Sequence, residues 1–343
     1  MRIGLFLGYS GRRLPDHVPL VQEADRLGFD SVWVAEAYGS DAVTVLTWLA
    51  AHTDRIRVGS GVLQMPARTP AMAAMTAVTL DELSGGRFRL GLGVSGPQVV
   101  EGWHGIAYGR PLQRTREYVT VIRRIIARDE PVTFAGTHYR IPYDGADATG
   151  LGKPLRITLH PGGEIPIYVA AIGPRNVQLT AEIADGWLPM FYSPYRASAV
   201  WGEALTAGFA ASGDERKEAS FDVAPSVPVV LGDDLEAAWA SIKPMVALYV
   251  GGMGARGKNF YNSLACRYGY EAAAATIQDL YLSGDRAAAV AAVPDELVDE
   301  ISLVGPRERI RDRLAAWEDA GVGTLLASVG DIGTLAALAE FVG

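Results

Sequence analysis

The sequence predicts a (β/α)8 TIM barrel, an α/β fold in which eight parallel strands form a closed sheet surrounded by helices. Eight short apolar runs recur along the chain, and amphipathic segments with helical spacing separate them. Apolar runs without alternation are typical of strands buried on both faces, as barrel strands are. The length of 343 residues, 49% of them hydrophobic, suits one such barrel with insertions.

The first unit shows the pattern that the others repeat. The apolar run RIGLFLG precedes PDHVPLVQEADRLG, in which Val18, Val21, Ala24 and Leu27 lie at helical spacing and Gly28 is a typical C-cap. Strands are expected at residues 2–8, 29–36, 56–64, 86–96, 166–173, 185–191, 222–232 and 323–330. Helices are expected at residues 15–28, 41–53, 70–84, 114–129, 174–184, 194–212, 233–250 and 306–321, with a short one at the end.

Two segments interrupt this order and are predicted to be insertions into a single domain spanning residues 1–343. The first, at about residues 131–165, follows the fourth helix and is rich in Gly and Pro, which favours a hairpin and a loop. The second, at about residues 251–300, follows the seventh strand and helix and adds further helices. Insertions in barrels usually lie at the carboxyl ends of the strands, where active sites are found.

Composition excludes several classes of function. The net charge of −8 disfavours nucleic acid and anionic membranes as partners. No apolar run approaches the length of a membrane span or a secretory signal, so a cytoplasmic location is expected. Cys266 is the single cysteine, so neither an internal disulfide nor a thiolate metal site is expected, and no metal is predicted.

The stretch LGLGVSG has the spacing G-x-G-x-x-G, which also occurs in dinucleotide-binding folds. Such a fold needs a helix that starts inside the motif and an acidic residue about twenty positions later, after a second strand. Here glycines interrupt the following segment, and a predicted helix occupies the later region. Gly93, Ser95 and Gly96 therefore form either a tight turn or a loop whose N–H groups face an anion.

Four strand ends taken together resemble the bacterial-luciferase-like superfamily, and more narrowly its branch that uses the deazaflavin coenzyme F420. The segments are SVWVAEAYGSDA, VGSGVLQMPARTP, RFRLGLGVSGP and PIYVAAIGPRNVQLTAEIADGWLP. The resemblance extends over nearly the whole chain. It implies a tricyclic ring at the carboxyl ends of the strands, backed by a non-proline cis peptide at Gly61–Val62. Gly59 and Gly61 remove side chains that would clash there.

The resemblance also assigns the rest of the cofactor site. The loop after the fourth strand and the start of the helix after the fifth strand would hold the phosphate and side chain of the cofactor. Pro174 suits the first turn of that helix, and Arg175 is either an added cationic contact or a solvated surface residue. The positions concerned are Ser95, Gly96, Ala170, Ala171, Gly173, Pro174 and Arg175.

Candidate catalytic residues follow from the same ends of the strands. Glu36 lies where the family places a polar residue beside the ring, and the alternative for it is a structural ion pair. Sugar-phosphate dehydrogenase members carry a histidine at the next position, where this chain has Ala37, which argues against alcohol oxidation of that kind. His104 and Tyr9 are the other candidate proton carriers. Tyr38 and Asp41 are expected at the same rim.

The glycine-rich segment GGMGARGKNFYN carries Arg256 and Lys258. In a protein of net charge −8, a local cationic patch suits an anionic ligand. Coenzyme F420 carries a phosphodiester and a glutamate tail, so the target is either this tail or an anionic substrate. A surface loop without a ligand is the alternative.

The function predicted is an F420-dependent oxidoreductase that moves a hydride between C5 of the deazaflavin and a small organic substrate. Reduction of an activated C=C or C=N bond is favoured, since the histidine base is absent at Ala37. One alternative is an FMN-dependent luciferase-like monooxygenase, and another is a non-catalytic F420-binding protein with its substrate face filled by Trp103, Tyr192 and Phe260. A homodimer is expected from the resemblance.

Overall fold

The computed structural model describes residues 1–8 and 13–342. Its main sheet is parallel, with the strand order β10-β9-β8-β5-β3-β2-β1-β13-β11-β12 and with β4 paired to β5. Strands occur at all eight predicted positions, and β12 is additional. Their bounds are β1 Arg2–Leu7, β2 Ser31–Val34, β3 Arg57–Ser60, β4 Leu63–Gln64, β5 Phe88–Gly93, β8 Ile167–Val169, β9 Gly186–Trp187, β10 Asp222–Val223, β11 Ser226–Leu231, β12 Leu303–Gly305 and β13 Thr324–Val329.

The sheet closes through β10 and β11, which together form the predicted seventh strand. β10 pairs with β9 on one side, and β11 pairs with β13 on the other. Ser226 at the start of β11 still forms a bridge to Met190, and its N–H donates to Pro189 O at 3.3 Å. Because only two residues separate β10 from β11, this stretch joins both edges of the curved sheet. The predicted barrel is therefore confirmed.

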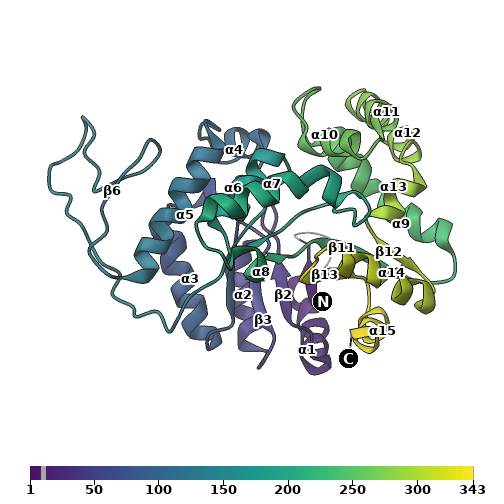
Figure 1. Ribbon diagram of the computed structural model, residues 1–343, viewed down its shortest axis with the longest axis horizontal. Coiled ribbons are helices and arrows are strands. Elements are labelled where there is room, and N and C mark those ends of the chain that lie inside the picture. The colour runs from purple at the N-terminus through teal and green to yellow at the C-terminus, as the bar shows by residue number, and fades with distance from the viewer. Residues whose placement is uncertain (9–12, 343) are drawn as a thin grey trace.

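Helices surround the sheet (Figure 1). Their ends use the expected residue types: Gly28 follows α1 in the left-handed conformation with φ 84°, and Asp41 caps α2 by accepting the Thr44 N–H at 2.7 Å. The bounds are α1 His17–Leu27, α2 Ala42–Ala51, α3 Pro70–Ser84, α4 Pro97–Gly102, α5 Pro111–Ala127, α6 Pro174–Ile183, α7 Ala197–Ser212, α8 Lys217–Ser220, α9 Leu235–Ala247, α14 Arg307–Asp319 and α15 Ile332–Val342.

Large side chains fill the inside of the barrel. Trp33 and Tyr168 meet edge to face with ring centroids 4.9 Å apart. Glycine makes room for them, since a Cβ atom at Gly59 would lie 2.6 Å from the Trp33 ring. Towards the carboxyl ends of the strands this packing is continued by half-buried side chains, namely Phe6, Val62 and Ala170. The barrel thus has a solid interior that ends in an apolar surface.

The first insertion contains the predicted hairpin, with β6 Phe134–Ala135 antiparallel to β7 Arg140–Ile141. Glu117 on α5 holds it, because its carboxylate accepts the N–H groups of Thr137, His138 and Tyr139 at 2.7 to 3.1 Å. Figure 1 shows the chain around β6 projecting away from the barrel. This segment therefore extends the surface of the molecule beside α5.

The second insertion is helical. A wide helical turn η3 Leu248–Gly252 leads into α10 Phe260–Arg267, α11 Glu271–Leu282, α12 Arg286–Ala291 and α13 Asp295–Glu300. Glu300 ties it to the chain after β9, where it accepts Ser193 Oγ at 2.9 Å and pairs with Arg196 at 3.1 Å. The insertion is thereby fixed beside the barrel.

Neither a membrane helix nor a metal cluster occurs in the ranges that the structure describes. No helix there has the length and apolar character needed to cross a bilayer. No group of three or more His, Cys, Asp or Glu side chains is arranged to hold a metal ion in that part of the chain.

Candidate active site

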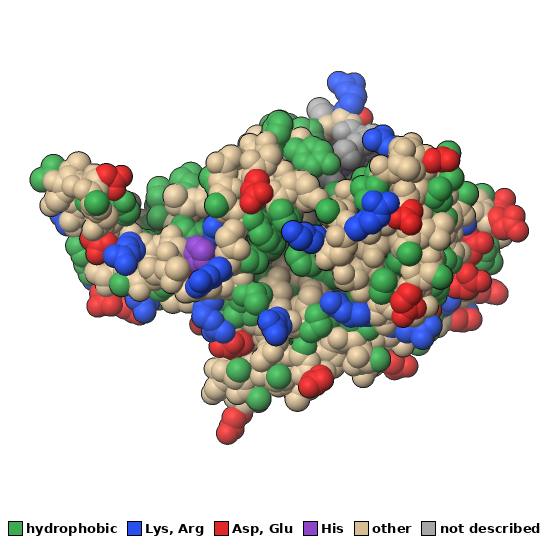
Figure 2. Space-filling view, turned by 90° about the horizontal axis from the view of Figure 1, so that it is seen from above, with side chains coloured by type: hydrophobic (Ala, Val, Ile, Leu, Met, Phe, Trp, Pro, Cys, Tyr) green, Lys and Arg blue, Asp and Glu red, His purple; other side chains and the backbone are tan. Residues whose placement is uncertain are grey.

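The predicted site residues meet at one end of the barrel, because the carboxyl ends of parallel strands share one edge. Glu36 follows β2, Gln64 ends β4, Ser95 follows β5 and Gly173 follows β8. Figure 2 looks onto this face and shows Lys and Arg side chains around a hollow near its middle. Helices that follow barrel strands begin at this end, so their positive N-termini face it as well.

The floor of this end is apolar. The peptide between Gly61 and Val62 is cis, the conformation that the resemblance implied. Phe6, Val62 and Ala170 are half-buried and pack against the buried cluster that contains Trp33. Gly93 lies so close that a Cβ atom there would be 2.6 Å from Val62 Cγ2. A planar ring system fits against such a platform, and bulkier residues would obstruct it.

Two helix N-termini beside the platform are open. Ser95 adopts the left-handed region at φ 60°, and Gly96 then precedes α4 without a side-chain cap. Gly173 precedes α6, again without a side-chain cap, and a Cβ atom built on it would meet nothing within 4 Å. The first N–H groups of a helix need an acceptor. The residues present therefore fit a ring that carries a phosphate-bearing side chain.

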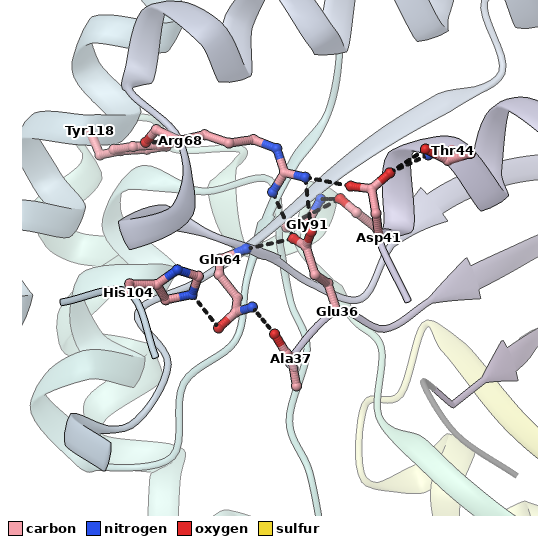
Figure 3. A network of polar contacts seen from close by, with 10 residues as sticks. Glu36, Ala37, Asp41, Thr44, Gln64, Arg68, Gly91, His104 and Tyr118 are labelled. Atoms are coloured by element: carbon pink, nitrogen blue, oxygen red, sulfur yellow. Dashed lines mark hydrogen bonds and ion pairs between the residues drawn. The ribbon is translucent and has the colours of Figure 1, made fainter. Parts of the chain in front are cut away.

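Glu36 is held by Arg68, a residue that the sequence analysis missed (Figure 3). Arg68 donates to both carboxylate oxygens of Glu36 at 2.7 and 2.8 Å, and to Asp41 Oδ1 at 2.8 Å. The Glu36 side chain is 9% exposed and that of Arg68 is 15% exposed. Hydrogen bonding to Glu36 raises the pKa of Arg68 against the opposing effect of burial. The Glu36 carboxylate is therefore paired rather than free.

Asp41 completes this cluster. Its carboxylate accepts both the N–H and the hydroxyl of Thr44, at 2.7 and 2.5 Å. Burial alone would raise the pKa of Asp41, but the Thr44 hydrogen bonds and the charge of Arg68 bring it below its ordinary value. The cluster of Glu36, Arg68 and Asp41 thus carries two negative charges and one positive charge.

Gln64 connects Glu36 to His104 (Figure 3). Its backbone N–H donates to Glu36 Oε2 at 3.3 Å, and its Nε2 donates to Ala37 O at 2.6 Å. Its Oε1 is 3.4 Å from His104 Nε2. Because a carbonyl only accepts, the Gln64 amide is oriented with its NH2 towards Ala37 and its oxygen towards the histidine. His104 Nε2 therefore carries a hydrogen, and Nδ1 is left without a partner among the described residues.

Comparison with known proteins agrees with this geometry. Residues 1–324 match the luciferase-like monooxygenase family. The chain belongs to this family. A Mycobacterium tuberculosis relative, provisionally named a coenzyme F420-dependent oxidoreductase, is 48% identical over 100% of this chain and 99% of its own. The 5,10-methylenetetrahydromethanopterin reductase of Archaeoglobus fulgidus is 31% identical over 90% of this chain and 87% of its own. The resemblance found in the sequence is therefore confirmed.

Solved structures show the same fold for this luciferase-like chain. The coenzyme F420-dependent tetrahydromethanopterin reductase of Methanopyrus kandleri superposes with a TM-score of 0.80 at 22% identity, covering 99% of this chain and 98% of that one. An F420-dependent secondary alcohol dehydrogenase gives a TM-score of 0.77 at 17% identity, with the same coverage. At these identities the likeness concerns the fold.

The surroundings of three other predicted residues of the luciferase-like barrel are as follows. Ala171 is buried in the core, and its carbonyl accepts Trp187 Nε1 at 2.9 Å. Arg256 is paired with Asp279 at 2.7 Å on the surface, whereas Lys258 is exposed. The remaining candidate, Tyr9, lies outside the described residues.

The three aromatic residues that would fill the substrate face in a non-catalytic binding protein differ in their burial. Tyr192 is 3% exposed, and its hydroxyl donates to Ala320 O at 2.9 Å, so it belongs to the core. Trp103 is 67% exposed and Phe260 is 47% exposed. In the insertion, the Tyr268 hydroxyl donates to Phe191 O at 2.8 Å. Tyr192 and Tyr268 are therefore packing residues rather than lining residues of a site.

Proposed function

We propose that the protein is an F420-dependent oxidoreductase that transfers a hydride between C5 of the deazaflavin and a small organic substrate. The observation that carries this proposal is the apolar platform of Phe6, Val62 and Ala170 beside two uncapped helix N-termini. The name of the relative at 48% identity supports the same cofactor. When bound, the cofactor supplies the hydride chemistry, and the protein supplies orientation and a proton.

The platform and the helix ends have separate tasks in this proposal. Val62 backs the ring, and Gly61 and Gly93 keep the approach open. Pro97 and Pro174 carry no N–H, so the backbone N–H groups of the next residues, Gln98 and Arg175, would bind the phosphate, as helix N-termini do. The Arg175 side chain is exposed on the first turn of α6 and lines a groove between α5 and α6.

His104 is the proton carrier in this proposal, and it acts through Nδ1. Gln64 fixes the hydrogen on Nε2 and cannot accept a proton from it, so Nδ1 is the nitrogen that exchanges protons. In the reduction of a C=C or C=N bond, the hydride adds to carbon and His104 Nδ1 delivers a proton to the other atom. The protonated imidazole is then restored from solvent.

Glu36 has an electrostatic rather than a proton-transferring role here. Arg68 donates to both of its oxygens, so Glu36 acts here as the carboxylate of a bidentate ion pair. The Glu36, Arg68 and Asp41 cluster has a net charge of about −1, by their ordinary ionisation states. With F420 bound, a negative charge near the ring would favour hydride transfer to the substrate, because hydride loss makes the ring more positive. The cluster therefore favours reduction of the substrate.

The proposal is tested with purified protein, reduced F420 and a panel of activated alkenes and imines, with matched alcohols and oxidised F420 as the reverse arm. We expect cofactor oxidation with acceptors of the first two classes, and loss of that activity in His104→Gln. Turnover of alcohols alone would refute the proposed direction and the proton-transfer role of His104.

An FMN-dependent monooxygenase is the second candidate, because the family description itself names monooxygenases. The platform would accept either ring, so the two candidates differ in cofactor and in the use of oxygen. Oxygen consumption with reduced FMN, and no reaction with reduced F420, would support this candidate.

We also propose a homodimer, in keeping with the expectation from the family. The outer faces of α2 and α3 expose Trp48 and Met75 at 55% and 50%, and Leu83 at 65%. An apolar face of this kind buried against its own copy would form a two-fold interface. We expect a dimer by light scattering and a monomer for Met75→Glu. A monomeric wild type would refute the proposal.

A further inference from the structure

A groove of about 310 Å3 lies between the start of α5 and the length of α6. Gln113 and Arg116 line it from α5, and Arg175, Gln178 and Glu182 line it from α6, together with two leucines. It begins at the helix end that follows Gly173, where the proposed phosphate site lies. The groove therefore continues from that site over the outside of the barrel.

The electrostatics of the groove favour an anion. Neither first turn of α5 or α6 contains an acidic residue, so both positive helix ends are uncompensated by such side chains. Arg175 is exposed, and its guanidinium has no hydrogen-bond or ion-pair partner in the ranges described. Glu182 is the one acidic residue that lines the groove. This arrangement occurs in a protein whose net charge is −8.

Glu182 reduces the positive charge of the groove without removing it. Arg116 donates to both of its oxygens at 2.6 and 2.5 Å. Bidentate pairing of this kind neutralises Arg116 and holds it against α6. Arg175 is then the cation of the groove that is available to a ligand.

We propose that this groove binds the first glutamates of the cofactor tail, with Arg175 paired to a tail carboxylate. The inference rests on the proposed function, because the tail belongs to F420. The groove is on the correct side of the phosphate site: the platform that faces the ring lies inside the barrel, whereas the groove lies between helices outside it. The glutamate tail is attached to the phosphate on the side opposite the ring. With the ring inside the barrel and the phosphate at the start of α6, the tail would extend into the groove.

The test is a binding measurement with three deazaflavins: full F420, a form with the phosphodiester but no glutamate, and the riboside without phosphate. Binding is followed by tryptophan fluorescence, without turnover. Arg175→Gln should weaken full F420 by about two- to fivefold and leave the glutamate-free form unchanged, as expected for one exposed ion pair. Glu182→Gln frees Arg116 and should tighten full F420 by a similar factor.

The control is Arg311→Gln, which makes the same change in net charge on α14, on another side of the molecule (Figure 1). It should leave all three affinities unchanged. Equal affinity of the wild type for full F420 and the glutamate-free form would overturn the groove inference alone. An equal loss for both forms in Arg175→Gln would also overturn it, because Arg175 would then bind the phosphate. Failure of all three forms to bind would overturn the proposed function, and the groove inference with it.

Discussion

The two ends of the barrel both carry arginines and carboxylates, but they use them differently. At the amino ends of the strands, Asp222 accepts Tyr168 at 2.9 Å and Thr324 at 2.8 Å and pairs with Arg2 at 2.8 Å. A cavity of about 740 Å3 opens there, lined by arginines and aspartates. At the carboxyl ends the charges surround an apolar platform and two open helix N-termini.

The difference shows that the size of a cavity does not identify a site. Helices end at the amino side of the barrel, and their negative ends are already satisfied there: Arg87 donates to the carbonyls of Ala50, Thr53, Ile56 and Ser84 at 2.6 to 3.1 Å. The charges at this end hold the structure together. At the opposite end α2, α3 and α9 are capped by Asp41, Thr69 and Asp234, whereas α4 and α6 have no side-chain cap. These two helix starts are where we propose that a ligand binds.

The largest expected effect on stability comes from substituting two glycines of the LGLGVSG stretch, Gly91 and Gly93. A Cβ atom at Gly91 would lie 1.8 Å from the backbone oxygen of Ser60, so Gly91→Ala should lower the free energy of unfolding by more than about 3 kcal/mol. Gly93→Ala meets a methyl group of Val62 at 2.6 Å rather than backbone, so it should cost less than Gly91→Ala while weakening cofactor binding about tenfold. Urea unfolding and cofactor titration measure the two quantities. The reverse ranking would contradict the account.

A histidine at each end provides the second test. His104→Gln should lower the rate of substrate reduction about 100-fold with unchanged cofactor affinity, because it removes the proton carrier. His52→Gln, at the C-cap of α2 on the opposite side, should leave the rate unchanged. Single-turnover rates with reduced cofactor measure this directly. Equal rates for both variants would remove His104 from the mechanism.

Two arginines give the third test. Arg68→Gln leaves Glu36 and Asp41 without their shared cation and should destabilise the protein by about 2 kcal/mol while also slowing reduction. Arg57→Gln breaks a more exposed pair with Asp30 and should cost about 1 kcal/mol without a change in rate. Thermal unfolding and turnover are measured on both variants. A slower rate of reduction in Arg57→Gln would contradict the claim that the charges at the amino end have only a structural role.

The smallest effect concerns pH and the amino end. The Asp25 carboxylate accepts the N–H groups of Asp54 and Ile56, each at 2.8 Å. Burial alone would raise the pKa of Asp25, but these hydrogen bonds hold it below its ordinary value of 3.8. A carboxylate whose pKa is lower in the folded state stabilises the protein at pH values above its unfolded-state pKa. This stabilisation is lost as the pH falls through the folded-state pKa.

Asp25→Asn should therefore cost about 1 kcal/mol at neutral pH and lose less stability than the wild type when the pH falls below about 4. Cofactor affinity should not change. Unfolding curves between neutral and acidic pH measure the difference. Parallel loss of stability in both proteins would show that Asp25 does not contribute to the acid sensitivity.

The sequence predicted the barrel well because each strand is a short apolar run buried on both faces. It missed α4, since Gly102 and the glycines after it suggested a loop, and it missed β12, which is only Leu303–Gly305 at the edge of β11. It found Glu36 but not Arg68, which lies 32 residues later. No local pattern marks that pair, because it depends on the pairing of β2 with β3 and on the turn after Gln64.

The central claim is that the carboxyl end of the barrel binds F420. The most direct measurement is titration of the purified protein with F420 and separately with FMN, followed by the tryptophan fluorescence; Trp33 lies beneath the platform and Trp103 lies one residue before His104. We predict micromolar or tighter binding of F420 and no saturable binding of FMN, and weaker binding of F420 in Gly93→Ala. Preference for FMN, or binding of neither, would contradict the account.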